Sequence, residues 1–202
     1  MIAIIDYGRG NLYSVEKAFH ILGAKAVVTR DAELIRAADK VVLPGVGAFG
    51  DCMANLHSYG LVDVIHTVIN QGKPFLGICL GLQLLFDGSE EDPGVAGLGV
   101  IPGIVKRIEA PNLKVPHMGW NSLRFCTVSP LFADLPGDPY VYFVHSYHAV
   151  PVNGRVITAV TDYGGTVTAA VSMGNVQAVQ FHPEKSSAIG MKMLENFKEI
   201  RL

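Results

Sequence analysis

One cysteine lies in a pattern that could make it a nucleophile. Cys79 occurs in Gly77-Ile78-Cys79-Leu80-Gly81, between an apolar run and a helical pattern. This is the spacing of a nucleophile elbow, a sharp strand-to-helix turn with no room for side chains at the flanking positions. The start of a helix favours the thiolate, which is the reactive form of cysteine. A cysteine simply buried at a tight turn would show the same five residues, so this pattern alone leaves both interpretations open.

A histidine and a glutamate further along the chain could serve that cysteine. His182-Pro183-Glu184 follows an apolar strand expected at residues 176–181. A cysteine nucleophile needs a base for its thiol proton, and the base needs a third group to fix its tautomer. In an extended backbone the side chains of His182 and Glu184 would point the same way. The sequence therefore predicts a triad of Cys79, His182 and Glu184.

Other residues could complete a site for acyl chemistry. Gln83 lies one helical turn after the cysteine, so it can face the same site. The reaction also needs two backbone N–H groups for an oxyanion. In elbow folds one comes from the residue after the nucleophile, here Leu80, and the other from a strand-to-helix loop. Residues 44–50 form such a loop, in which Gly45 and Gly47 would let the backbone turn an N–H toward the oxyanion.

Nucleotide and metal chemistry are disfavoured by the same motifs. The loop at residues 44–50 has no Walker lysine, and residues 6–11 lack the third glycine of a dinucleotide fingerprint. No CxxC follows His182, as a zinc deaminase would require, and no HExxH occurs. Cys52 and Cys126 have no ligand-like neighbours and are expected to be core thiols. We therefore expect neither a metal nor a cofactor.

The elements that must position these residues follow from the periodicity. Short apolar strands are expected at residues 2–5, 27–29, 41–43 and 75–78, and helices at 11–22, 31–37, 52–56, 61–69 and 80–86. Apolar strands that alternate with helices indicate a parallel sheet covered on both faces. From residue 97 the pattern changes to short β segments, best at 141–144, 149–150, 156–160, 167–171 and 176–181, before a helix at 187–200. We expect a single α/β domain over residues 1–202, with a mostly parallel central sheet flanked by helices and an antiparallel β extension in the second half.

Composition narrows the class of protein further. The 202 residues are 50% hydrophobic and 17% charged, with a formal net charge of −2. This predicts a globular chain and argues against a general binder of nucleic acid or membrane surfaces. No apolar run approaches the ~20 residues that a membrane span needs, and the first residues lack the features of a signal peptide. The 3 cysteines have no CxxC spacing and indicate reduced thiols in a cytoplasmic protein.

Taken together, the motifs resemble a known family. Residues 77–83 (Gly-Ile-Cys-Leu-Gly-Leu-Gln) with His182-Pro183-Glu184 resemble the class I, triad-type glutamine amidotransferases. Four further motifs resemble one branch of that family, the glutaminase subunits of imidazole glycerol phosphate synthases. They are Asp6-Tyr7-Gly8-Arg9-Gly10-Asn11, Pro44-Gly45-Val46-Gly47-Ala48-Phe49-Gly50, Lys114-Val115-Pro116-His117-Met118-Gly119-Trp120-Asn121 and Tyr142-Phe143-Val144-His145-Ser146-Tyr147. Two departures, Leu82 where methionine is common and Ser187 where glycine is usual, touch no catalytic role.

The resemblance implies a reaction and its residues. Cys79 would attack the side-chain carboxamide of glutamine while His182 relays protons and Glu184 orients it. Ammonia would leave, and water would convert the γ-glutamyl thioester to glutamate. The resemblance assigns the oxyanion N–H groups to Val46 and Leu80, and the contacts to glutamine to Gly47, Gln83, His145, Ser146 and Tyr147.

The resemblance also implies a protein partner. In this family a (β/α)8-barrel cyclase subunit forms a heterodimer with the glutaminase. The cyclase uses the ammonia to make imidazole glycerol phosphate and an aminoimidazole carboxamide ribotide, in a step of histidine biosynthesis that also feeds purine synthesis. One glutaminase-sized domain accounts for this sequence and leaves no site that accepts ammonia, which would be protonated and lost if set free. Asn11, Trp120, Tyr142 and Lys185 lie in the motifs that face the cyclase, although Trp120, the only tryptophan, could also be a core aromatic.

Three other functions remain as alternatives. A glutaminase of another pathway would share the triad but should lack the motifs at residues 6–11 and 114–121. A cysteine hydrolase or isopeptidase could use the same elbow on a broad range of peptides. A regulatory binding module with a vestigial site usually lacks a triad member, whereas all three are present here.

Overall fold

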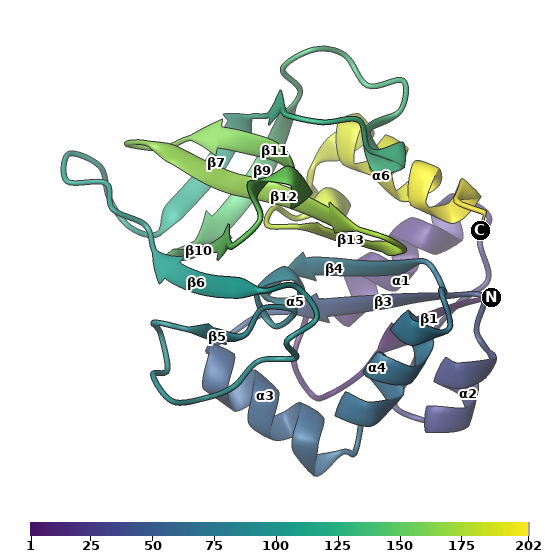
Figure 1. Ribbon diagram of the computed structural model, residues 1–202. Helices are drawn as coiled ribbons and strands as arrows, with labels where there is room; N and C mark the ends of the chain where they lie inside the picture. The colour runs from purple at the N-terminus through teal and green to yellow at the C-terminus, as the bar shows by residue number, and fades with distance from the viewer. Residues whose placement is uncertain (202) are drawn as a thin grey trace.

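The computed structural model, which describes residues 1–201, is built on a mixed central sheet (Figure 1). Among these residues the sheet has eight strands in the order β2-β1-β3-β4-β13-β12-β11-β8. The strands are β1 (Ile2–Ile5), β2 (Ala26–Thr29), β3 (Lys40–Gly45), β4 (Phe75–Cys79), β8 (Arg124–Phe125), β11 (Ile157–Asp162), β12 (Thr166–Met173) and β13 (Val176–Val179). The five strands from β2 to β13 in this order are parallel, and β12, β11 and β8 continue the sheet antiparallel. The predicted fold class is thus confirmed.

Helices cover both faces of the parallel strands, because alternate side chains of a strand point to opposite faces. In β1, Ile2 and Ile4 belong to one hydrophobic core, which α1 (Leu12–Ile21) and α6 (Ser187–Glu199) complete. Ala3 and Ile5 belong to the other core, which α2 (Ala32–Ala37), α3 (Phe49–Ser58) and α4 (Val62–Asn70) complete. Figure 1 shows the two helix groups on opposite sides of the sheet.

The antiparallel part of the chain forms two small sheets beside the central one. β7 (His117–Ser122) pairs with β9 (Tyr140–His145), and β6 (Gly103–Arg107) lies between β10 (Tyr147–Pro151) and β5 (Gly88–Ser89). Short 3-10 turns occur at η1 (Pro130–Phe132), η2 (Gly154–Val156) and η3 (Pro183–Lys185). These sheets lie at the end of the parallel strands where β4 terminates, so they can wall a site there (Figure 1).

Several predicted boundaries were wrong. The helix expected over residues 80–86 is only α5 (Leu80–Gln83), since the chain then turns to hydrogen-bond with residues 97–101. The loop expected over 44–50 is shorter, because β3 runs through Gly45 and α3 begins at Phe49. The last predicted strand ends at Val179.

Two further predictions, on the burial of the cysteines and on membrane-spanning helices, concern the described residues. All three cysteines are free; Cys52 is buried as predicted, but Cys126 is exposed, so its assignment to the core was wrong. Cys126 follows the two-residue edge strand β8, which buries little. In the part of the chain that the structure describes, no helix combines the length and apolar character needed to cross a bilayer.

Candidate active site

The backbone turns sharply at Cys79, where β4 meets α5. Cys79 has φ 56° and ψ −110°, a conformation that L residues rarely adopt. Its flanking glycines are required by close contacts: a Cβ on Gly81 would lie 1.8 Å from the carbonyl oxygen of Leu43, and a Cβ on Gly77 would lie 2.9 Å from the carbonyl oxygen of Gly81. The predicted elbow geometry is therefore present. It places Cys79 at the carboxyl end of the parallel strands, where α/β folds form their ligand sites.

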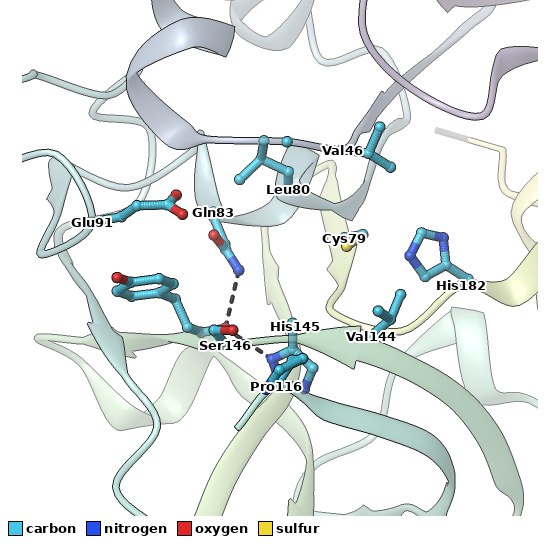
Figure 2. A pocket seen from close by; sticks show the side chains of 12 residues that line it. Val46, Cys79, Leu80, Gln83, Glu91, Pro116, Val144, His145, Ser146 and His182 are labelled. Carbon is cyan, nitrogen blue, oxygen red and sulfur yellow. Dashed lines mark hydrogen bonds between the residues drawn. The ribbon is translucent and has the colours of Figure 1, made fainter. Parts of the chain in front are cut away.

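A cavity of about 300 Å³ opens in front of Cys79 (Figure 2). All the predicted catalytic, oxyanion and substrate residues line it except Glu184, namely Val46, Gly47, Cys79, Leu80, Gln83, His145, Ser146, Tyr147 and His182. Glu91, Pro116 and Val144 also line it, although their residue types and spacing did not predict this. Pro116 and Val144 belong to motifs quoted above, whereas Glu91 lies in an acidic stretch with no recognisable spacing.

Glu184 lies behind His182 and fixes its ring. Nδ1 of His182 is 2.8 Å from Oε1 of Glu184, and both side chains are almost fully buried. The two residues are brought together by the 3-10 turn η3, so the extended backbone predicted for them was wrong. Because a carboxylate only accepts, the His182 proton lies on Nδ1 and Nε2 is left to face the sulfur. Figure 2 shows the His182 ring beside Cys79, and Nε2 has no hydrogen-bond partner within residues 1–201.

The electrostatics of the site favour a charged His182. Burial alone would lower its pKa, but the interactions with Cys79 and Glu184 outweigh burial and raise the pKa to about 10. A protonated imidazole beside a cysteine stabilises the thiolate. Cys79 and His182 therefore suit an ion pair that attacks a carbonyl carbon and then protonates the leaving group.

The loop after β3 contributes Val46 and Gly47 to the lining of the cavity. Val46 is partly exposed to the cavity, and Gly47 has φ 108°, a value that only glycine adopts readily. The thiol of Cys52 donates to the carbonyl oxygen of Val46 at 3.6 Å. Below the loop lies the buried hydroxyl of Tyr7, only 2.5 Å from where a Cβ on Gly45 would be. Leu80 opens α5 directly after Cys79, and the two residues predicted to supply the oxyanion N–H groups, Val46 and Leu80, line one cavity.

Two other histidines near the cavity are poor candidates for the catalytic base. Burial lowers the pKa of His145 to about 3, despite a hydrogen bond from its Nδ1 to the carbonyl oxygen of Tyr147. Burial also lowers the pKa of His148, whose Nδ1 accepts from the backbone N–H of Thr168. Neither has a carboxylate on its ring as His182 has.

The four residues predicted at a protein interface lie on neighbouring elements. Trp120 is 52% exposed and packs edge-on against Tyr142, its partner in the β7–β9 register, with ring centroids 6.2 Å apart. It is therefore not a core aromatic. The backbone of Tyr142 bonds to His182 N and Ser186 Oγ, on either side of the turn that carries the exposed Lys185. Asn11 precedes α1, which packs near η3.

Metal binding receives no support from the side-chain positions. Among residues 1–201, no group of three or more His, Cys, Asp or Glu side chains is arranged to hold a metal ion.

Comparison with known proteins identifies relatives over nearly the whole chain. The sequence profile of the family described as glutamine amidotransferase class-I matches residues 3–200. The chain is 55% identical over 199 residues to the imidazole glycerol phosphate synthase subunit HisH of Moorella thermoacetica, covering 98% of this chain and 94% of the relative. It is 56% identical over 200 residues to the HisH subunit of Methanothermobacter thermautotrophicus, covering 99% and 98% respectively.

Solved structures agree on the fold. A crystal structure described as a glutamine amidotransferase superposes with a TM-score of 0.76 at 20% identity, covering 98% of this chain and 100% of the other. The structure of PurLQS from Thermotoga maritima gives a TM-score of 0.76 at 19% identity, covering 98% and 96%. At such identities the likeness concerns the fold alone.

Proposed function

Because the chain belongs to the class I glutamine amidotransferases, and within them to the HisH glutaminase subunits of imidazole glycerol phosphate synthase, we propose that Cys79, His182 and Glu184 hydrolyse glutamine. The observation that carries this proposal is the elbow cysteine facing a buried His182–Glu184 pair across one cavity. The chain then acts as a glutaminase in histidine biosynthesis, and we propose that residues 1–202 form one domain for this purpose.

The proposed mechanism uses the ion pair in two stages. The thiolate of Cys79 attacks the carboxamide carbon, and the C–N bond breaks as Nε2 of His182 protonates the leaving nitrogen, which departs as ammonia. Neutral His182 then removes a proton from water, whose oxygen attacks the thioester. The C–S bond breaks, which releases glutamate and regenerates the thiolate and imidazolium. Glu184 keeps the Nδ1 proton in place throughout.

Backbone N–H groups would stabilise the tetrahedral intermediates. We assign this role to Leu80 and Val46, which line the cavity together with Cys79 (Figure 2). Removal of one such donor typically lowers kcat by roughly 10²–10³-fold. Because Gly45 and Gly47 allow two orientations of the Val46 peptide, we infer that the isolated chain is nearly inactive and that the partner selects the productive orientation.

Other residues of the cavity offer polar groups that could bind the α-amino and α-carboxylate groups of glutamine. Gln83, Gly47 and the backbone of residues 145–147 line the cavity and offer hydrogen-bond groups to a substrate. Glu91 adds a carboxylate to the lining of the cavity, and its Oε2 accepts from the backbone N–H of Phe49 at 2.9 Å. A held carboxylate suits an α-ammonium group, so we add Glu91 to the proposed substrate residues.

We propose that the partner is a (β/α)8-barrel cyclase subunit in a heterodimer, located in the cytoplasm. The support is the name of the relatives, which are subunits of a synthase, together with the exposed aromatic pair Trp120 and Tyr142 beside Lys185. Exposed aromatic side chains are enriched at protein interfaces. The interface would lie close to His182 because the Tyr142 backbone bonds directly to this residue.

Glutamate release from glutamine tests the proposed function. The chain would be assayed alone, and then with the cyclase subunit and its ribonucleotide substrate, beside a Cys79→Ala variant. Strong release only in the full mixture, absent in the variant, would support both the triad and the coupling. Equal release without the partner would keep the triad but contradict the loop hypothesis. No release in any mixture would favour a binding module with a vestigial site, and hydrolysis of a broad range of peptides would favour a cysteine hydrolase.

A further inference from the structure

A chain of buried hydrogen bonds, which the mechanism above does not use, ends at the nucleophile. Gln180 is fully buried directly after β13, and its Nε2 donates to Sγ of Cys79 at 3.8 Å. Its Oε1 accepts from Nε2 of Gln83 at 3.0 Å. The same nitrogen of Gln83 also donates to the carbonyl oxygen of Tyr147 at 3.0 Å. Two amide side chains thus connect the reactive sulfur to the wall that would hold the substrate.

The hydrogen-bond chain continues away from the cavity through two histidines. Nδ1 of His145 lies 2.8 Å from the same carbonyl oxygen of Tyr147, and Nε2 of His145 lies 3.0 Å from Nδ1 of His117. Nε2 of His117 lies 3.2 Å from Nδ2 of Asn121, which also donates to the carbonyl oxygen of Asp162 at 2.8 Å. The chain therefore spans from β7 to the elbow.

Chemistry permits only one arrangement of protons along this chain. Burial lowers the pKa of His117 to about 4 and that of His145 to about 3, so each ring is neutral and has one donor and one acceptor. The central carbonyl only accepts, so His145 carries its proton on Nδ1, His117 donates to His145, and Asn121 donates to His117. Gln83 must also donate to that carbonyl, so its amino group faces Gln180 as well. Gln180 is left with Oε1 toward Gln83 and its N–H groups toward the sulfur.

We propose that Gln180 is a positioning residue of the glutaminase reaction: its N–H group holds the ionised sulfur of Cys79 while its carbonyl oxygen holds Gln83 against the substrate. This inference rests on the proposed function. An ionised sulfur accepts hydrogen bonds, and bonds to charged groups are the stronger kind. The opposite orientation of the amide would direct an oxygen lone pair at the thiolate and would break the bond to Gln83. The carbonyl oxygen of Tyr147 excludes that orientation, because it can only accept and therefore fixes the amino group of Gln83, which in turn donates to Oε1 of Gln180.

The main test compares Gln180→Leu with a matched substitution at Gln177, within β13. Gln177 is also a buried glutamine, but it bonds to Ser129 and Ser172, outside the cavity. Both variants would be assayed for glutamate release with the cyclase subunit and its ribonucleotide substrate. For Gln180→Leu we expect kcat to fall roughly 10- to 100-fold, as for a lost bond to a charged group, and KM for glutamine to rise because Gln83 is released. Gln177→Leu should keep both constants.

The rate at which iodoacetamide alkylates Cys79 distinguishes a positioning role of Gln180 from a purely structural one, because the two roles predict opposite changes in this rate. Cys126 is exposed and serves as the reference thiol in the same molecule, with both sites followed by peptide mass spectrometry. Loss of the Gln180 hydrogen bond should slow alkylation of Cys79 relative to Cys126 by roughly tenfold. A substitution that merely loosens the core would instead speed it, because Cys79 would become more accessible.

A second variant keeps the inference testable if Gln180→Leu does not fold. Gln180→Met keeps an unbranched side chain but removes both the donor to Cys79 and the acceptor for Gln83. We expect the same direction of change as for Gln180→Leu, a lower kcat and slower alkylation of Cys79. Wild-type kcat and wild-type alkylation in whichever Gln180 variant folds would overturn the inference while the proposed function stands. If the wild-type complex releases no glutamate, the proposed function fails, and alkylation alone decides whether Gln180 holds the sulfur.

Discussion

A single buried histidine, His182, and a buried pair, His145 with His117 behind it, lie at the cavity, and their charge states are opposite. His182 is 2% exposed and has its pKa raised to about 10, whereas His117 and His145 are 2% and 6% exposed and have theirs lowered to about 4 and about 3. Burial acts on all three in the same direction, because it disfavours the imidazolium ion. The difference comes from the partners: His182 faces a carboxylate and a thiol, while His117 and His145 face each other, an amide and a carbonyl.

Local structure decides which partner each histidine meets. Glu184 is two residues from His182, and the tight turn η3 folds its carboxylate back onto the ring. His117 and His145 are instead directly opposite each other in the β7–β9 register, so each is the other's neighbour. Equal burial thus produces one cation suited to proton transfer and one neutral pair suited to fixing hydrogen-bond direction. The role of a buried histidine follows from its neighbours and not from its burial.

The substitution Glu184→Gln should have the largest effect, because it removes the partner that makes His182 differ from His117 and His145. The substitution keeps the shape of the side chain but removes the negative charge that holds the His182 proton, so the pKa of His182 falls. We expect kcat for glutamine hydrolysis in the cyclase complex to fall roughly 10²–10⁴-fold, as for the third member of other triads. Steady-state kinetics gives the loss, and NMR titration of the His182 ring gives the change in pKa.

Glu33→Gln on the exposed surface of α2 is a suitable control for this experiment, since Glu33 pairs only with Arg36 there. It should retain the wild-type kcat. A Glu184→Gln variant with undiminished kcat would contradict the charge-based account of His182.

An intermediate effect is expected in the pH dependence of stability. The folded pKa of His117 lies below its unfolded value, so as the pH falls below about 6.5 the unfolded chain binds a proton that the folded chain does not, and stability is lost. With a folded pKa of about 4, His117 alone lowers the free energy of unfolding by about 2 kcal/mol at pH 5. His117→Phe should therefore lose about 2 kcal/mol less than the wild type between pH 7 and pH 5.

Urea unfolding of the isolated chain at pH 7, 6 and 5 would measure this difference. Trp120→Phe, on the same strand, removes no titratable group and should keep the wild-type dependence on pH. If His117→Phe and the wild type lose stability in parallel, His117 is not held neutral in the folded state.

The parts of the site that follow from backbone geometry could be predicted from sequence. Gly77 and Gly81 around Cys79 mark a turn with no room for side chains, and this turn is where the chain meets Leu43. The parallel strands were equally predictable, since apolar side chains on both faces of a strand imply cover on both faces. His182 and Glu184 were found because the chemistry of a cysteine nucleophile calls for them, although the backbone between them is a turn and not extended.

Residues that act through long-range contacts could not be predicted in this way. The sequence of β7 contains histidine, glycine and asparagine and shows no alternation of apolar and polar residues, so it does not predict a strand. β7 pairs with only one strand, β9, in the described part of the chain, and its His117 packs between the rings of Phe143 and Tyr163. Gln180 is polar within an apolar run, but its contacts to Gln83 and Cys79 lie about a hundred positions away, at separations of 97 and 101. Only the folded chain shows that such a residue has partners on both sides.

The smallest effect that we expect is on stability, and it concerns a buried hydroxyl that has neither a charged nor a neutral hydrogen-bond partner among the described residues. The hydroxyl of Tyr7 is fully buried and makes no hydrogen bond in the described part of the chain, and burial raises its pKa well above the ordinary range, with Cys52 adding to the shift. A buried hydroxyl without a partner loses its hydration and gains nothing in return. Tyr7→Phe should therefore stabilise the isolated chain, by about 1 kcal/mol in urea unfolding at pH 7. Destabilisation by a similar amount would mean that the hydroxyl does have a partner in solution, the candidate being the thiol of Cys52, and would tie Tyr7 to the oxyanion loop, since Cys52 donates to the carbonyl oxygen of Val46.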